Sequence, residues 1–127
     1  MKKVILTVAI VLATLSTQAQ TGVITVKDKN QLIKLEQWYT LERKGWENTM
    51  IMSFENESKM DEFLKKYLEE VSDREAVSID LSNAQTDPDG DKFWKFIGQN
   101  QDVIVISRMA LEDKKDYNVQ VTIISEQ

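Results

Sequence analysis

The chain has 127 residues, of which 42% are hydrophobic and 8% aromatic, and it carries 16 basic and 21 acidic side chains. This composition is typical of one small globular domain and excludes collagen-like and low-complexity chains. Because the sequence has no histidine and no cysteine, it also excludes disulfides, zinc sites built on thiolate or imidazole, and catalysis by a cysteine nucleophile or a histidine base.

The first nineteen residues have the pattern of a secretory signal peptide. Lys2 and Lys3 give a positive start, a short apolar stretch follows from Val4 to Leu15, and the small residue Ala19 precedes the expected cut. The apolar stretch is shorter than the roughly 20 residues that span a bilayer. We therefore expect an exported, periplasmic or extracellular domain over residues 20–127, with no membrane insertion after cleavage.

Cleavage would also change the charge of the chain. It removes two lysines and no acids, which leaves 14 basic against 21 acidic residues and a net charge of −7. We expect no nucleic acid partner, because a polyanion requires a basic patch.

The N-terminal third contains one segment with two interpretations. Residues 23–27 form a β-prone run, and residues 49–54 read as a buried strand. Between them, residues 31–44 either form a helix that ends at Gly45 or alternate as one arm of a hairpin that turns at 43–45. The helix is favoured because the segment is rich in good helix formers.

The clearest element is a helix over residues 57–71, capped by Asn56 or Ser58. Its apolar residues recur at the spacing of one helical face, namely Met60, Phe63, Leu64, Tyr67, Leu68 and Val71. Residues 76–81 then alternate as a strand, and a polar loop over 82–91 leads to a short predicted helix over 91–98 that ends at Gly98.

The last two predicted strands are 103–109 and 117–123. The run from Val103 to Ile106 predicts burial on both faces of the first. This order of elements predicts a small α/β domain with a mixed, mostly parallel sheet, a C-terminal antiparallel hairpin at its edge, and helices packed on it. Residues 49–81 would form a right-handed parallel crossover. A two-layer α+β sandwich is the alternative if residues 31–54 form a hairpin.

The loop over 82–91 and the end of the preceding strand offer oxygen ligands suited to calcium or magnesium, namely Asp80, Ser82, Asp87, Asp89 and Asp91. Ligands of open α/β sheets bind beyond the carboxyl ends of strands, which is where this loop begins. The spacing does not match an EF-hand, because Phe96 stands where the bidentate glutamate belongs. The alternative is a turn around Pro88 whose aspartates cap the following helix.

Two short segments that begin with aspartate resemble the sequence of a known protein family. Asp80-Leu81-Ser82-Asn83 is followed by Asp87-Pro88-Asp89-Gly90, and with the predicted elements from Thr49 to Met109 these residues resemble the anti-sigma-factor-antagonist (STAS) family. The resemblance implies a strand, helix, strand, helix, strand order over half the chain. The phosphorylatable serine of the family is absent here, and a strand replaces its last helix, so no function is carried over.

Three aromatic residues, Trp38, Tyr39 and Trp46, lie close together in the sequence and either belong to the core or contact a partner or sugar. No residue combination identifies a catalytic group. We therefore expect an exported, acidic, non-catalytic binding or inhibitor-like module for a basic protein, with the oligomeric state left open. We expect no cofactor for this module. Calcium binding by the 82–91 loop is the alternative function and would make calcium the bound ion. A carboxylate-dependent hydrolase is the second alternative.

Overall fold

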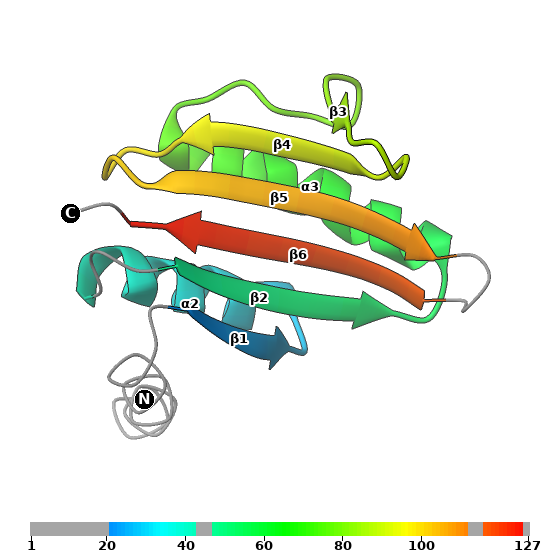
Figure 1. Cartoon of the computed structure of the whole chain (residues 1–127), viewed down its shortest axis with the longest axis horizontal. Coiled ribbons are helices and arrows are strands. Elements are labelled where there is room, and N and C mark those ends of the chain that lie inside the picture. The colour runs from blue at the N-terminus through cyan, green and yellow to red at the C-terminus, as the bar shows by residue number, and fades with distance from the viewer. Residues whose placement is uncertain (1–20, 43–46, 112–115, 126–127) are drawn as a thin grey trace.

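Six strands form one sheet in the part of the chain that the computed structural model describes, residues 21–42, 47–111 and 116–125 (Figure 1). The strands lie in the order β1-β2-β6-β5-β4-β3. Their bounds are β1 Thr21–Val26, β2 Glu47–Phe54, β3 Gln85–Thr86, β4 Lys92–Ile97, β5 Val103–Leu111 and β6 Asp116–Ile124. The two helices are α2, Lys29–Glu42, and α3, Glu57–Glu75.

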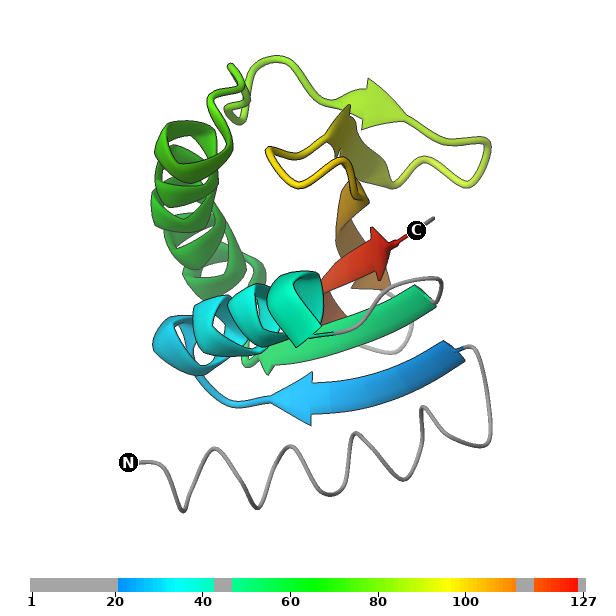
Figure 2. The ribbon, with the colours of Figure 1, turned by 90° about the vertical axis from the view of Figure 1, so that its left-hand side faces the viewer.

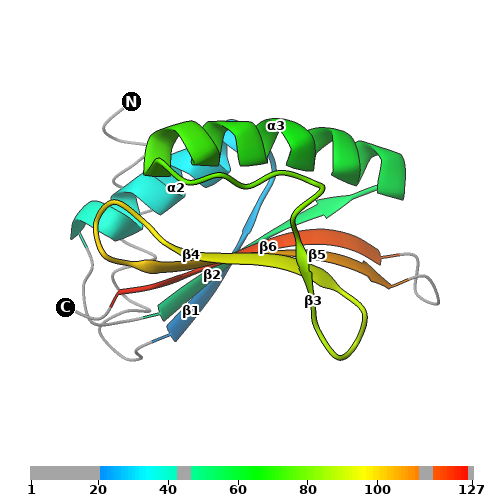
Figure 3. The same ribbon diagram turned by 90° about the horizontal axis from the view of Figure 1, so that it is seen from above.

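Both helices pack on the same face of the sheet, as Figures 2 and 3 show. The core lies between them and the sheet. It includes Leu32 of α2, Leu64 and Tyr67 of α3, and Met50 and Val121 of the central strands. The predicted fold class is thus confirmed: the chain forms a small α/β domain with a mixed sheet, a C-terminal antiparallel hairpin and helices packed on it.

The pairing of the strands differs from the prediction in two respects. Only β1 and β2 run parallel, and the other four pairs are antiparallel, so the expected majority of parallel pairs is wrong. The hairpin of β5 and β6 lies inside the sheet, because β6 also pairs with β2 along eight residues. The parallel crossover consists of β1, α2 and β2, and not of residues 49–81.

The helix predictions are confirmed by α2 over residues 31–42 and by α3 over residues 57–71, and the hairpin alternative is wrong. The predicted helix end at Gly45 lies outside the described residues. The Asn56 side chain caps α3 by accepting a hydrogen bond from the Lys59 N–H at 2.9 Å. The helix ends at Ala76, which is in the left-handed conformation with φ +56°.

Residues 76–81 do not form the predicted strand. Their backbone is held by side chains instead: the Ser72 hydroxyl bonds to both the N–H and the carbonyl of Ile79, at 3.2 and 2.9 Å. The Asp80 N–H donates to Asn83 Oδ1 at 2.9 Å. Because α3 and the following turn satisfy these polar groups, the alternating segment pairs with no described strand.

Where a helix is predicted over residues 91–98, the structure has strand β4, Lys92–Ile97. The spacing of Phe93, Trp94 and Ile97 fits a helical face, but the same residues are good strand formers. All six residues of β4 pair in register with β5, and buried Trp94 lies opposite Ile106. Long-range pairing with a β-branched strand therefore overrides the local periodicity. These two changes also remove the strand and helix order on which the STAS resemblance depends.

Candidate functional site

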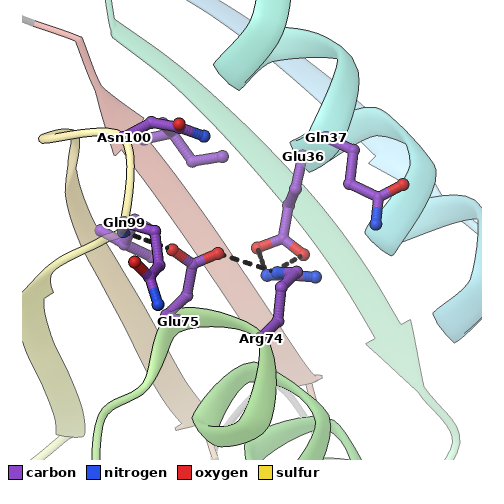
Figure 4. A pocket seen from close by; sticks show the side chains of 8 residues that line it. Glu36, Gln37, Arg74, Glu75, Gln99 and Asn100 are labelled. Atoms are coloured by element: carbon purple, nitrogen blue, oxygen red, sulfur yellow. Dashed lines mark hydrogen bonds and ion pairs between the residues drawn. The ribbon is translucent and has the colours of Figure 1, made fainter.

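A pocket of about 300 Å³ opens where α2, the last turn of α3 and the β4–β5 turn meet (Figure 4). Buried isoleucines of β5 and β6 form its floor, charged residues of both helices form its wall, and exposed amide side chains surround its mouth. The lining residues are Glu36, Gln37, Arg74, Glu75, Gln99, Asn100, Ile104 and Ile123.

Arg74 connects two carboxylates in this pocket. Its Nε donates to Glu75 Oε2 at 2.9 Å, and its Nη2 donates to both carboxylate oxygens of Glu36 at 3.3 Å. The other oxygen of Glu75, Oε1, accepts the Gln99 N–H at 2.8 Å. One guanidinium therefore links α2 to α3, and Glu75 links α3 to the β4–β5 turn.

Glu36 is buried, with 2% of its side chain exposed. Burial raises its pKa from 4.5 to about 7, since removing a carboxylate from water disfavours the charged form. The Arg74 guanidinium and the nearby Tyr67 hydroxyl offset part of this rise. The Tyr67 hydroxyl makes no hydrogen bond of good geometry with the described residues. The pocket thus contains a carboxyl group that changes charge near neutral pH.

The β4–β5 turn reaches Glu75 because residue 98 is glycine. The turn is closed by the Gly98 N–H donating to the Asp102 carbonyl at 2.8 Å and by the Gln101 N–H donating to the Gly98 carbonyl at 3.0 Å. A Cβ on Gly98 would lie 2.6 Å from Glu75 Oε1 and 2.9 Å from Ile104 Cδ1. The turn can therefore approach the Glu75 carboxylate only with a glycine, which has no side chain, at position 98.

The predicted metal ligands lie in two separate turns. Asp80 accepts the Ser82 N–H at 2.8 Å, whereas Asp87 Oδ1 accepts the N–H groups of Asp89 and Asp91, each at 2.9 Å. The aspartates thus cap turns and not a helix. The strand predicted over residues 76–81, from whose end the loop was expected to leave, does not form, and the short strand β3 ends just before Asp87. Burial, with Asp87 and Asp89 nearby, raises the pKa of Asp91.

Calcium binding by these turns stays a prediction. Within residues 21–42, 47–111 and 116–125, no group of three or more acidic side chains is arranged to hold a metal.

The three predicted aromatic contacts are placed only in part. Trp38 is partly buried against the core in α2. Tyr39 belongs to α2, but its side chain and Trp46 lie outside the described parts of the chain. Their role as ligand or partner contacts stays a prediction.

Sequence reasoning missed the three charged residues of the pocket. One local signal was available: Leu32, Leu35 and Glu36 share a helical face that the core buries. An acid at such a position requires a buried cation, which is Arg74. Nothing in the sequence between residues 36 and 74 shows that pairing.

None of the helices in the described part of the chain is long and apolar enough to cross a membrane. Comparison with family models, curated proteins and solved structures finds no match for this chain.

Proposed function

We propose that this chain is an exported, non-catalytic binding module whose pocket between α2 and α3 holds a lysine or arginine side chain of a basic protein partner. The observation that carries the proposal is that Glu36 and Glu75 line one cavity with a single arginine between them. When both acids are ionised, the three groups have a net charge of −1.

A long cationic side chain uses every part of the pocket. Its methylene groups can lie on Ile104 and Ile123, while its charged end approaches the carboxylates. The exposed amides of Gln37, Gln99 and Asn100 are suited to hydrogen bonds with the backbone of the same partner. An anionic ligand would meet two carboxylates and is disfavoured.

The charge of the whole chain supports a basic partner. After the expected cleavage, 21 acids stand against 14 basic residues, so the chain attracts cationic proteins from a distance and speeds their encounter. Export rests on residues 1–19, and the mass of the protein secreted by a host tests it directly. A mature chain that begins at Gln20 is the expected result.

The binding test uses two peptides that differ only in charge, acetyl-Ala-Lys-Ala-amide and the same peptide with norleucine. Titration into the ¹⁵N-labelled protein should shift the Gln99 and Asn100 amide signals with the lysine peptide only. Glu75→Gln should weaken binding about tenfold, because a charge-assisted hydrogen bond is lost. Glu62→Gln removes an exposed acid on α3 and should leave binding unchanged.

The pH dependence of the titration gives a second criterion. A bound cation favours ionised Glu36, so binding should strengthen as the pH rises through about 7. Equal binding of both peptides, or equal loss in Glu75→Gln and Glu62→Gln, would contradict the proposal.

A carboxylate-dependent hydrolase is a second candidate, favoured by one observation. Glu36 has a pKa of about 7 and shares its cavity with Glu75, and an acid with a raised pKa beside a second carboxylate is suited to acid catalysis. Turnover of aryl glycosides that both Glu36→Gln and Glu75→Gln abolish would favour this function over binding alone.

A further inference from the structure

One face of the sheet carries no helix, because α2 and α3 both lie on the other, and only the loop between β3 and β4 projects on this side, at the β4 edge, among the described residues (Figures 2 and 3). Side chains alternate between the two faces. The uncovered face is called the open face below. In β1, β2, β4 and β5 it consists of the odd-numbered residues within 23–25, 47–53, 93–97 and 103–109. In β6 it consists of the even-numbered residues within 118–124. The even-numbered residues of β2 and the odd-numbered residues of β6 are the ones that face the core.

The open face is unusually poor in charge for this chain. Charged residues make up 29% of the sequence, yet Glu47 and Lys95 are the only two among the described side chains of this face. Its apolar residues include Val23 and Ile97, which are 60% and 63% exposed. The solvent side of an antiparallel sheet is usually polar. Here apolar residues stand among neutral polar ones such as Thr49 and Thr122, and exposed apolar residues that gather on one face indicate an interaction site.

Strand β5 supports the same conclusion. The run from Val103 to Ile106 predicts burial on both faces, but the chain itself buries only Ile104 and Ile106. Val103 and Val105 point to the open face and remain partly exposed. A second layer over this face would complete the burial that the sequence indicates.

We infer that a second copy of this chain covers the open face, with the two sheets packed face to face about a twofold axis that runs along the strands between β5 and β6. Such an axis places β6 of each subunit over β5 of the other. It also places β2 of each subunit over β4 of the other, because β2 is the neighbour of β6 and β4 is the neighbour of β5. Sheets packed in this way form a sandwich about 10 Å thick.

The two charges of the open face fit this arrangement. Glu47 is in register with Ile97 across β6 and β5, and Lys95 is two residues along β4. The twofold axis therefore brings Glu47 within about 7 Å, along the strand, of the position of Lys95 in the partner subunit. The pair forms twice in the dimer, so the two opposite charges among the described side chains of the face neutralise each other.

The area of the open face and its charge are compatible with a second copy. A chain with net charge −7 after cleavage repels its own copies, but the described side chains of the open face, with one acid and one base, add no net charge to the contact. Five strands with about seven residues each give roughly 550 Å² of flat area. Side-chain relief raises this towards the ~800 Å² that each partner contributes to a standard interface.

The test is the mass of the secreted protein in solution, measured by sedimentation equilibrium over a range of concentrations. The wild type should be a dimer. Val105→Glu places a charge in the centre of the open face and should give a monomer. Leu81→Glu makes the same kind of change at an exposed position away from the sheet and should remain a dimer. Circular dichroism verifies that each variant is folded.

A charge swap tests the relative orientation of the two subunits. It uses two substitutions at the surface, which leave the core intact. Lys95→Glu should weaken the dimer about tenfold, because it replaces an attraction across the interface with a repulsion. Adding Glu47→Lys should restore the wild-type affinity. A monomeric wild type, a dimeric Val105→Glu, or no recovery in the double variant would each overturn the inference. Glu75→Gln should leave the dimer intact, which separates this test from that of the pocket.

Discussion

Gly98 and Glu75 approach so closely that a methyl group on Gly98 would lie 2.6 Å from Glu75 Oε1. The contact connects the β4–β5 turn to the end of α3, because Gln99 donates its N–H to the same oxygen at 2.8 Å. The turn can therefore lie this close to the Glu75 carboxylate only because residue 98 has no side chain.

Gly98→Ala should destabilise the protein by about 1–3 kcal/mol, the usual cost of overpacking. The added methyl group must displace the Glu75 side chain from Gln99 and press on Ile104. Urea unfolding measures the change. In a Glu75→Ala background the same substitution should cost less, since one of the two clashing groups is absent. Equal costs in the two backgrounds would show that Glu75 is not the group displaced.

The pH dependence of stability should carry a contribution from Glu36. Its pKa is about 7 in the folded protein against an ordinary value of 4.5, so the folded state binds the proton more tightly. The resulting stabilisation is fully present below pH 4.5 and is lost as the pH rises through about 7.

Glu36→Gln removes this dependence. When the pH rises from about 5 to about 8, the wild type should lose up to roughly 3 kcal/mol of unfolding free energy relative to the variant. Urea unfolding at both pH values measures the difference. Glu62→Gln, which changes an exposed acid, should follow the wild-type profile. Parallel profiles for wild type and Glu36→Gln would contradict the raised pKa.

Removing the cation of the pocket should be the most damaging change. Arg74→Met leaves the buried Glu36 carboxyl without its ion-pair partner and Glu75 without one of its hydrogen bonds. A broken buried ion pair costs about 3–5 kcal/mol. The double variant Arg74→Met with Glu36→Gln should recover part of this loss, because no buried charge then lacks a partner. If the double variant is no more stable than Arg74→Met alone, Arg74 stabilises the protein by packing and not through its ion pair with Glu36.

The turn around Asp87 should lose stability when its cap is removed. Asp87→Ala removes the acceptor for the N–H groups of Asp89 and Asp91 and should cost about 1 kcal/mol. Thermal melts measure this loss, and melts of the wild type with and without calcium test the metal prediction. A calcium site at 100 times its dissociation constant adds about 2.7 kcal/mol. A rise in Tm that magnesium reproduces equally would leave only a capped turn.

Several elements could be predicted from local sequence because neighbouring residues carry the whole signal. The apolar spacing of α3 and its Asn56 cap are complete within twenty residues, and β2 and β6 alternate along their own length. The choice of helix for α2 was also local, since it depended on helix propensity. The same local logic failed at β4, where the burial of Trp94 depends on pairing with a distant strand that places Ile106 opposite it.

What the sequence alone determined is therefore the fold class, most of the elements, and the chemistries that a chain without histidine or cysteine cannot perform. Only the tertiary structure brought together Glu36 and Arg74, which are 38 residues apart, and placed β6 between β2 and β5. The reason is physical. Periodicity and capping act between residues a few positions apart, whereas strand order, buried ion pairs and uncovered faces depend on contacts that form only when distant segments pack.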